Sequence, residues 1–176
     1  MKRRAWVLGG AAIAAGAAGA GFSWHKTQLT GDSGTPLGPD FWAQRFERPE
    51  GGELALESLR SAPLLLNFWA TWCPPCIKEM PLLDGFHRQH QSTGWHVLGL
   101  AIDSPTPVRE FLAKRPVGFP IGLAGLAGTD LSRTLGNANG SLPFTVVVGA
   151  NGKVIDRKLG ALNAADLARW VAKGQT

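Results

Sequence analysis

The chain has 176 residues, of which 44% are hydrophobic, enough for one packed domain with a short terminal extension. Its formal net charge is +5, but three of the positive charges are Lys2, Arg3 and Arg4, which leaves only +2 for the rest. The length excludes a (β/α)8 barrel, the lack of a repeat excludes a solenoid, and the weak residual charge argues against a nucleic-acid-binding surface.

The first 22 residues have the pattern of an export signal. A charged start is followed by an uncharged, Ala- and Gly-rich stretch over residues 5–22, with small residues at Ala18-Gly19-Ala20. Arg3-Arg4 also fits a twin-arginine signal. Two outcomes stay open, namely cleavage after Ala20 or retention of the stretch as a membrane anchor. Both outcomes predict that the folded part lies outside the cytoplasm.

The folded domain is expected over residues 39–176. Residues 23–38 are rich in Gly, Ser, Thr and Pro and predict a linker. The segment Phe41–Leu59 contains Arg-Pro-Glu-Gly-Gly-Glu in its middle, which predicts a hairpin followed by a turn of helix. Pro63–Trp69 is a short, nearly continuous apolar run and predicts a strand that is buried on both faces.

Cys73 and Cys76 are the only cysteines, and a bridge across two residues restrains little of the unfolded chain. The pair therefore indicates a redox couple rather than a structural disulfide. A helix is predicted over Pro74–His90, with a kink at Pro81. Cys73 is expected at the start of this helix, where the dipole and the free N–H groups favour a thiolate. We expect Cys73 to attack and the more enclosed Cys76 to resolve.

The same cysteines are half of a zinc-type pattern that continues with His87 and His90. On one continuous helix, however, Cys76 and His87 would lie roughly 16 Å apart, too far to share a metal. We therefore expect no metal and no other cofactor, and we expect the two histidines on a solvated face of the helix.

The remainder of the chain alternates strands and helices. The expected elements are a strand over Trp95–Asp103, a helix over Val108–Lys114 capped by Ser104 or Thr106, a short strand over Pro120–Leu123, a helical turn over Leu131–Leu135, an antiparallel pair over Phe144–Val148 and Val154–Leu159, and a helix over Ala164–Lys173 capped by Asn163. This order predicts an α/β domain.

The segment Asn67–Pro81, with Asn-Phe-Trp-Ala followed by Thr-Trp-Cys-Pro-Pro-Cys, resembles the signature of the TlpA-like branch of the thioredoxin superfamily. The ResA-like and CcmG-like proteins, which serve cytochrome c maturation, belong among these relatives. A looser resemblance extends over residues 39–173. It implies a thioredoxin-like fold, in which helices flank a central mixed sheet, with an N-terminal hairpin and a strand–helix insertion in residues 104–136.

The resemblance also implies a substrate site. It places Pro143 at a cis-proline that precedes a strand and faces the Cys-x-x-Cys helix, whereas the residues alone leave a trans proline as the alternative. The backbone of Leu142 is expected to pair with the substrate, and Trp72 is expected to line the substrate groove. The expected substrate-binding residues are Trp72, Pro74, Pro75, Leu142 and Pro143.

Glu79 follows Cys76 by three residues, so both side chains fall on one helix face. The acid at this position is functional in ResA-like relatives, which implies that Glu79 moves the proton of the resolving thiol. The alternative is a solvated carboxylate that favours the helix dipole. Thioredoxin has a buried Asp at the position of Asn67, so acid–base help would come here from Glu79, Asp103 or water.

These features predict a protein disulfide reductase at the periplasmic or extracytoplasmic face of a bacterial inner membrane. Its partners would be a disulfide-bearing exported protein and a membrane thiol electron donor, and the relatives imply a role in cytochrome c maturation. A disulfide oxidant or isomerase and a non-catalytic metal-binding chaperone are the alternatives. A thiol peroxidase would not need the Trp-Cys-Pro-Pro-Cys helix. We expect a monomer that binds no nucleic acid.

Overall fold

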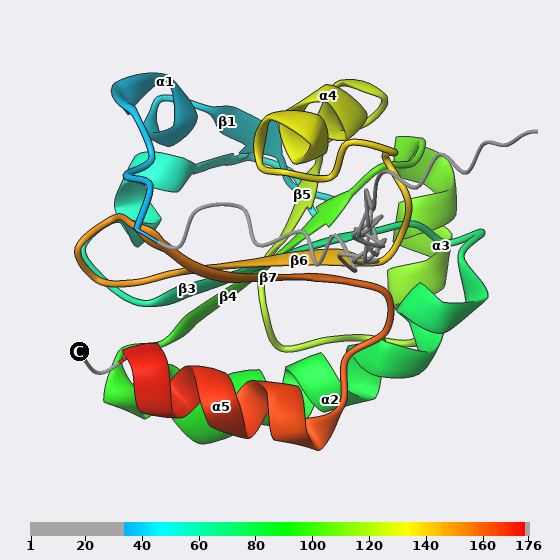
Figure 1. The fold of residues 1–176 in the computed structure, drawn as a ribbon. Helices are drawn as coiled ribbons and strands as arrows, with labels where there is room; N and C mark the ends of the chain where they lie inside the picture. Colours follow the sequence, from blue (N-terminus) through cyan, green and yellow to red (C-terminus); the bar gives the residue numbers. More distant parts are fainter. Residues whose placement is uncertain (1–33, 175–176) are drawn as a thin grey trace, which may run out of the picture.

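The computed structural model describes residues 34–174, and the strands of this part form one mixed sheet in the order β2-β1-β5-β4-β3-β6-β7 (Figure 1). The strands are β1 Arg45–Glu47, β2 Glu53–Ala55, β3 Leu64–Trp69, β4 His96–Ala101, β5 Ile121–Leu123, β6 Phe144–Val148 and β7 Val154–Leu159. The helices are α1 Pro39–Trp42, α2 Pro74–His90, α3 Pro105–Lys114, α4 Ala127–Thr134 and α5 Ala164–Gly174, with 3-10 turns η1 Leu56–Leu59 and η2 Gln91–Thr93.

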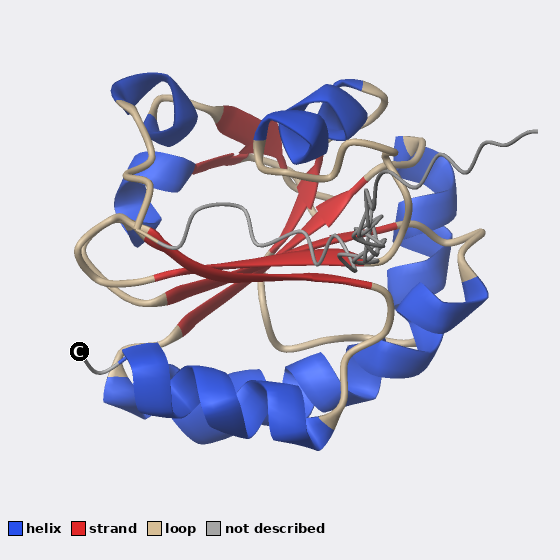
Figure 2. Cartoon of the chain, in the orientation of Figure 1, coloured by secondary structure: helices blue, strands red, loops and turns tan. Residues whose placement is uncertain are grey.

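Helices lie on both sides of the sheet, as Figure 2 shows. Helices α2 and α5 cover one face, and α1 and α4 lie on the opposite side. The expected hairpin is formed by β1 and β2, and the expected insertion supplies β5 and α4. Strand β5 enters the sheet between β1 and β4, parallel to β4.

Strand β3 lies next to the middle of the sheet, parallel to β4 and antiparallel to β6. All six of its residues are buried, as the continuous apolar run predicts. Leu65 and Trp69 belong to the core beneath α2 and α5, whereas Leu66 and Phe68 belong to the core on the other face. Asn67 alternates with Leu66 and Phe68 along the strand, so its polar side chain points toward α2.

Several details differ from the prediction. Helix α1 was not expected, and α4 begins four residues before the expected turn at Leu131. Ser104 occupies the N-cap position of α3, but its side chain makes no capping hydrogen bond. His87 and His90 are half-buried rather than solvated, because their rings pack beside Phe119 and Phe86.

The cap of α5 is as predicted. Asn163 Oδ1 accepts a hydrogen bond from the N–H of Asp166 at 3.0 Å, and Asp166 Oδ2 accepts one from the N–H of Asn163 at 3.1 Å. This reciprocal pair satisfies two backbone donors at the start of the helix.

No helix within residues 34–174 is both long and apolar enough to span a bilayer. The predicted signal or anchor over residues 1–22, and the predicted linker as far as residue 33, lie outside the described residues. The end of that linker is attached to the domain, since the N–H of Gly34 bonds the carbonyl of Val154 and the N–H of Leu37 bonds that of Gly152.

Gly99 allows β4 to pack closely against its neighbours. A Cβ at this position would lie 2.6 Å from Cδ1 of Ile121 and 3.1 Å from Nε1 of Trp69. We expect Gly99→Ala to lower the free energy of unfolding by about 1–3 kcal/mol, because the core must shift to admit the methyl group. Urea unfolding of the oxidised protein measures this change.

Gly85→Ala is the matched control. Gly85 is exposed in the interior of α2, and a Cβ there would meet no atom within 4 Å. This substitution should raise the free energy of unfolding by roughly 0.5–1 kcal/mol, since alanine favours the helix. An unchanged stability in Gly99→Ala would contradict the close packing of β4.

Candidate active site

Cys73 and Cys76 are joined by a disulfide across the first turn of α2, with their Cα atoms 5.3 Å apart. Cys73 is the N-cap residue of the helix, and Pro74 and Pro75 are its first two residues. Their missing N–H groups remove no helical hydrogen bond, because the first turn has no intrahelical acceptors for them. The sequence Cys-Pro-Pro-Cys therefore places Cys73 at the beginning of the helix.

The surroundings of Cys73 favour negative charge on its sulfur. The N–H of Cys76 donates a hydrogen bond to Cys73 Sγ at 3.3 Å. When the bridge is reduced, this donor and the positive end of the helix dipole both stabilise a thiolate at Cys73. Cys76 is completely buried, whereas Cys73 retains 4% of its surface, so an incoming disulfide meets Cys73 first.

Pro143 lies at the same end of the sheet. Its peptide bond with Leu142 is cis, and β6 begins directly afterwards with Phe144 paired to Phe68. This register places Pro143 opposite Trp69, just before the turn that leads to Cys73. Leu142 is half-buried and packs against the core cluster that includes Cys73.

A pocket of about 470 Å³ opens beside this end of the sheet. Trp72, Leu142 and Leu126 are among its lining residues. Trp72 and Leu126 are two of the few large apolar side chains exposed in the described part of the chain, at 65% and 88%. The pocket lies where a substrate groove is expected at Trp72, and apolar side chains line part of it. Leu126 is a lining residue for which the sequence carries no signal.

Asp103 fixes the turn before the cysteines. Its Oδ2 accepts hydrogen bonds from the N–H of Thr71 at 2.9 Å and from the hydroxyl of Thr71 at 2.5 Å. Its Oδ1 accepts one from the N–H of Ser104 at 2.7 Å. The carboxylate therefore holds the loop that carries Trp72 in place. Both of its oxygens accept hydrogen bonds from this loop or from Ser104.

Glu79 lies on the buried side of α2, one turn after Cys76, and is only 3% exposed. Its Oε1 accepts a hydrogen bond from Nδ2 of Asn67 at 2.8 Å, and its Oε2 accepts one from the N–H of Leu162 at 2.7 Å. The solvated carboxylate that was the alternative is therefore wrong. The acid faces the sheet from the same helix face as the buried thiol.

Burial raises the pKa of Glu79 above its ordinary value of 4.5. The hydrogen bonds from Leu162 and Asn67 and the positive charge of Lys158 favour the ionised form, but they offset the burial only in part. A carboxyl with a raised pKa is better matched to proton exchange with a thiol near neutral pH than an ordinary glutamate.

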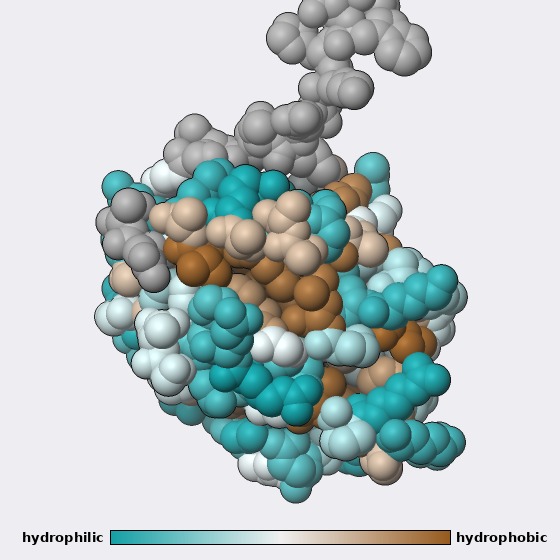
Figure 3. Space-filling model, turned by 90° about the horizontal axis from the view of Figure 1, so that it is seen from below, coloured by the Kyte–Doolittle hydropathy of each residue, from teal (hydrophilic) through white to brown (hydrophobic). Residues whose placement is uncertain are grey.

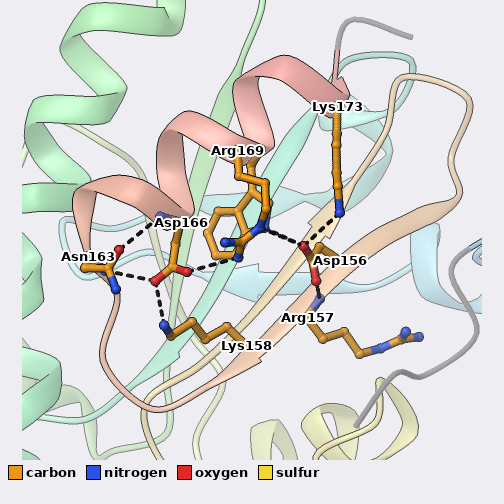
Figure 4. A network of polar contacts seen from close by, with 8 residues as sticks. Asp156, Arg157, Lys158, Asn163, Asp166, Arg169 and Lys173 are labelled. Carbon is orange, nitrogen blue, oxygen red and sulfur yellow. Dashed lines mark hydrogen bonds and ion pairs between the residues drawn. The ribbon is translucent and has the colours of Figure 1, made fainter. Parts of the chain in front are cut away.

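A network of charged groups joins β7 and α5 (Figure 4). Lys158 forms an ion pair with Asp166 at 2.5 Å, and Arg169 contacts the other oxygen of Asp166 at 3.0 Å. Asp156 accepts a hydrogen bond from Nε1 of Trp170 at 2.9 Å. Burial raises the pKa of both aspartates, but their hydrogen bonds outweigh it and leave each pKa below its ordinary value.

Comparison with known proteins gives the family. The Redoxin family model matches residues 33–170, which is most of the chain. The chain belongs to the Redoxin family. It is 31% identical over 151 residues to the thiol-disulfide oxidoreductase ResA of Geobacillus thermodenitrificans, covering 84% of this chain and 80% of that protein. The ResA of Bacillus subtilis is 26% identical over 162 residues, covering 89% and 87% of the two chains.

Solved structures show the same fold. A thiol:disulfide interchange protein of the thioredoxin family from Chlorobium tepidum superimposes with a TM-score of 0.71 at 23% identity, covering 81% of this chain and 97% of that one. A thioredoxin-related protein from Neisseria meningitidis gives a TM-score of 0.66 at 30% identity, covering 75% and 98%. The predicted resemblance, the thioredoxin-like α/β fold and the class of thiol–disulfide oxidoreductase are confirmed.

Proposed function

We propose that this protein reduces disulfides of exported proteins outside the cytoplasm. The observation that carries the proposal is the Cys73–Cys76 pair, with one sulfur at a helix start and the other buried on the same helix face as Glu79. The similarity to proteins named thiol-disulfide oxidoreductase supports the chemistry. The export-type pattern of residues 1–22 supports the location.

The reaction begins with both cysteines reduced. The thiolate of Cys73 attacks one sulfur of the substrate disulfide, so that a Cys73–substrate bond forms, the substrate S–S bond breaks and one substrate thiolate leaves. The thiolate of Cys76 then attacks Cys73 Sγ, which forms the Cys73–Cys76 bridge and releases the second substrate thiolate. Two electrons pass from the protein to the substrate, and a membrane dithiol donor returns two electrons to the bridge.

Glu79 accepts the proton that Cys76 must lose before the second attack. The Cys76 thiol is completely buried, so bulk water cannot take this proton and a base within the fold is needed. The side-chain amide of Asn67 can form a hydrogen bond with either the ionised or the protonated form of Glu79. Its Nδ2 donates to the carboxylate, and its Oδ1 is buried without a hydrogen-bond partner among the described residues. A protonated Glu79 would supply a hydroxyl for such an acceptor.

The substrate approaches through the apolar pocket at Trp72. An extended segment would pair with the backbone of Leu142 while an apolar side chain enters the space between Trp72 and Leu126. Pro74, Pro75 and Pro143 offer no backbone donors that would compete for this segment. Exported apocytochromes are one proposed substrate class, because the resemblance to ResA-like proteins implies cytochrome c maturation.

Leu126→Ala tests the pocket. Leu126 is 88% exposed and stands at the N-cap of α4, where neither leucine nor alanine supplies a capping side chain, so the substitution should leave the free energy of unfolding unchanged. We expect kcat/KM for a polypeptide disulfide to fall roughly threefold to tenfold, which corresponds to losing part of the burial energy of one leucine. The reduction of a small disulfide such as oxidised glutathione should not change. Equal losses for both substrates would contradict a role in docking polypeptides.

The proposed function is tested by electron transfer from the isolated domain. The reduced protein is mixed with an unfolded polypeptide that carries a single disulfide, and the free thiols of each partner are counted over time. We expect two protein thiols to be lost for each substrate disulfide reduced. The variant in which both cysteines are serine is the control. A wild-type domain that transfers no electrons would contradict the proposal.

A further inference from the structure

Two charged groups, Lys158 on β7 and Asp166 on α5, have no part in the reaction described so far. The pairing of β3 with β6 and of β6 with β7 places Asn67, Thr145 and Lys158 in one row across the sheet. Side chains at paired positions lie on the same face, so all three point toward α2 and α5. Nδ2 of Asn67 bonds Glu79 Oε1 at 2.8 Å and Thr145 Oγ1 at 3.0 Å. The row therefore leads from Glu79 to the ammonium of Lys158.

The loop between β7 and α5 gives a second connection. The N–H of Leu162 donates to Glu79, and the N–H of the next residue, Asn163, donates to Asp166. Two carboxylates are thus bound by successive amides of one short loop. The Lys158 ammonium lies 2.5 Å from Asp166 Oδ2 (Figure 4). Its positive charge also favours the ionised form of Glu79. Lys158 therefore acts on two carboxylates, the buried Glu79 and Asp166 at the start of α5.

We propose that Lys158 and Asp166 are a positioning pair for Glu79, which sets how readily this carboxylate exchanges a proton with the Cys76 thiol. The inference rests on the proposed function, because it assigns regulation to the same dithiol site. Lys158 favours the ionised, proton-accepting form of Glu79. Asp166 holds the ammonium by an ion pair and so limits its effect on Glu79.

Few charged groups other than Lys158 face Glu79. Strands β3 and β6 present only the neutral side chains of Asn67 and Thr145, and the loop presents the N–H of Leu162. On its own helix, the neighbouring Lys78 is exposed to water. Arg169 lies on the other side of Asp166 and contacts its second oxygen. Among the described residues, Lys158 is the charge that acts on the pKa of Glu79.

Opposite substitutions should have opposite effects. Lys158→Met removes the cation, so Glu79 should hold its proton to higher pH. Asp166→Asn keeps an oxygen for the cap of α5 but releases the ammonium, so Glu79 should lose its proton at lower pH. Lys158→Arg keeps the charge and should behave as the wild type.

The readout is the pH dependence of the second chemical step. A preformed mixed disulfide between Cys73 and a model polypeptide is followed in a single turnover while Cys76 displaces the substrate. We expect the midpoint to rise by about 0.5–1 pH unit in Lys158→Met and to fall by a similar amount in Asp166→Asn. Lys173→Met, which removes a cation bonded to Asp156, should leave the midpoint unchanged.

A second measurement does not depend on catalysis. The side-chain carboxyl of Glu79 is titrated by carbon NMR in the oxidised protein, and the shifts should have the same signs as the kinetic ones. If both variants are folded, midpoints that do not move, or that move in the same direction in both, would contradict the proposed role of Lys158 and Asp166.

Failure of the proposed function would give a different result. The wild type would then transfer no electrons, whereas the NMR titration would still report whether Lys158 and Asp166 act on Glu79.

Discussion

Cys76→Ser is expected to trap the substrate on the enzyme. Cys73 can still attack, because its thiolate is stabilised by the start of α2 and by the N–H of residue 76, which serine retains. The mixed disulfide then persists, since no second sulfur is present to displace the substrate. Turnover should fall to background, while a covalent adduct with one polypeptide accumulates on a non-reducing gel.

Cys73→Ser should give neither turnover nor adduct. The remaining sulfur, Cys76, has no exposed surface and cannot meet a bulky disulfide. Peptide mapping of the trapped complex identifies the sulfur that carries the substrate. An adduct on Cys76 in the Cys73→Ser variant, with none in the Cys76→Ser variant, would reverse the two roles.

Glu79→Gln is expected to slow the resolving step by about 100-fold or more at neutral pH, which is the lower end of what a positioned general base contributes. The amide oxygen can still accept the N–H of Leu162, and Asn67 can turn its unpartnered Oδ1 toward the new NH2 group. The amide cannot, however, take the proton of Cys76. The rate should also lose the pH dependence that Glu79 gives it. Single-turnover decay of the mixed disulfide measures both effects.

Stability provides the control for this variant. Because the folded protein raises the pKa of Glu79 above 4.5, the contribution of Glu79 to stability is greatest below that value and is lost as the pH rises through the folded pKa. Glutamine has no such titration. The variant should therefore gain in free energy of unfolding relative to the wild type as the pH rises, so a slow reaction would not reflect unfolding. A rate equal to that of the wild type would make Glu79 a structural residue.

Local patterns were sufficient to predict most elements of the fold. A continuous apolar run defines β3, and the paired prolines after Cys73 define the start of α2, because both signals lie within a few residues. The beginning of α4 was missed, because the first turn, Ala-Gly-Thr-Asp, contains a glycine and two weak helix formers and has no capping side chain. Four-residue α1 has too few residues for any periodicity to appear.

The site was only partly predictable for a related reason. Cys73 and Cys76 are recognisable together, whereas the groups that tune Glu79 come from distant parts of the chain. Asn67 is 12 residues before Glu79, and Leu162 is 83 residues after it. Lys158 carried no signal at all, since an isolated lysine on a strand resembles any surface lysine. Leu126 was missed because its exposure depends on how the loop after β5 is placed.

The reduction potential of the Cys73–Cys76 pair tests the proposed direction of electron flow most directly. Strong oxidants of this fold have a stabilised reduced form, whereas the bridge of a reductase is harder to reduce. Equilibration of the purified domain with glutathione redox buffers, followed by counting of free thiols, gives the value. A reductase is expected to lie below about −200 mV, toward the thioredoxin range. A potential near about −120 mV, typical of a disulfide oxidant, would contradict the account.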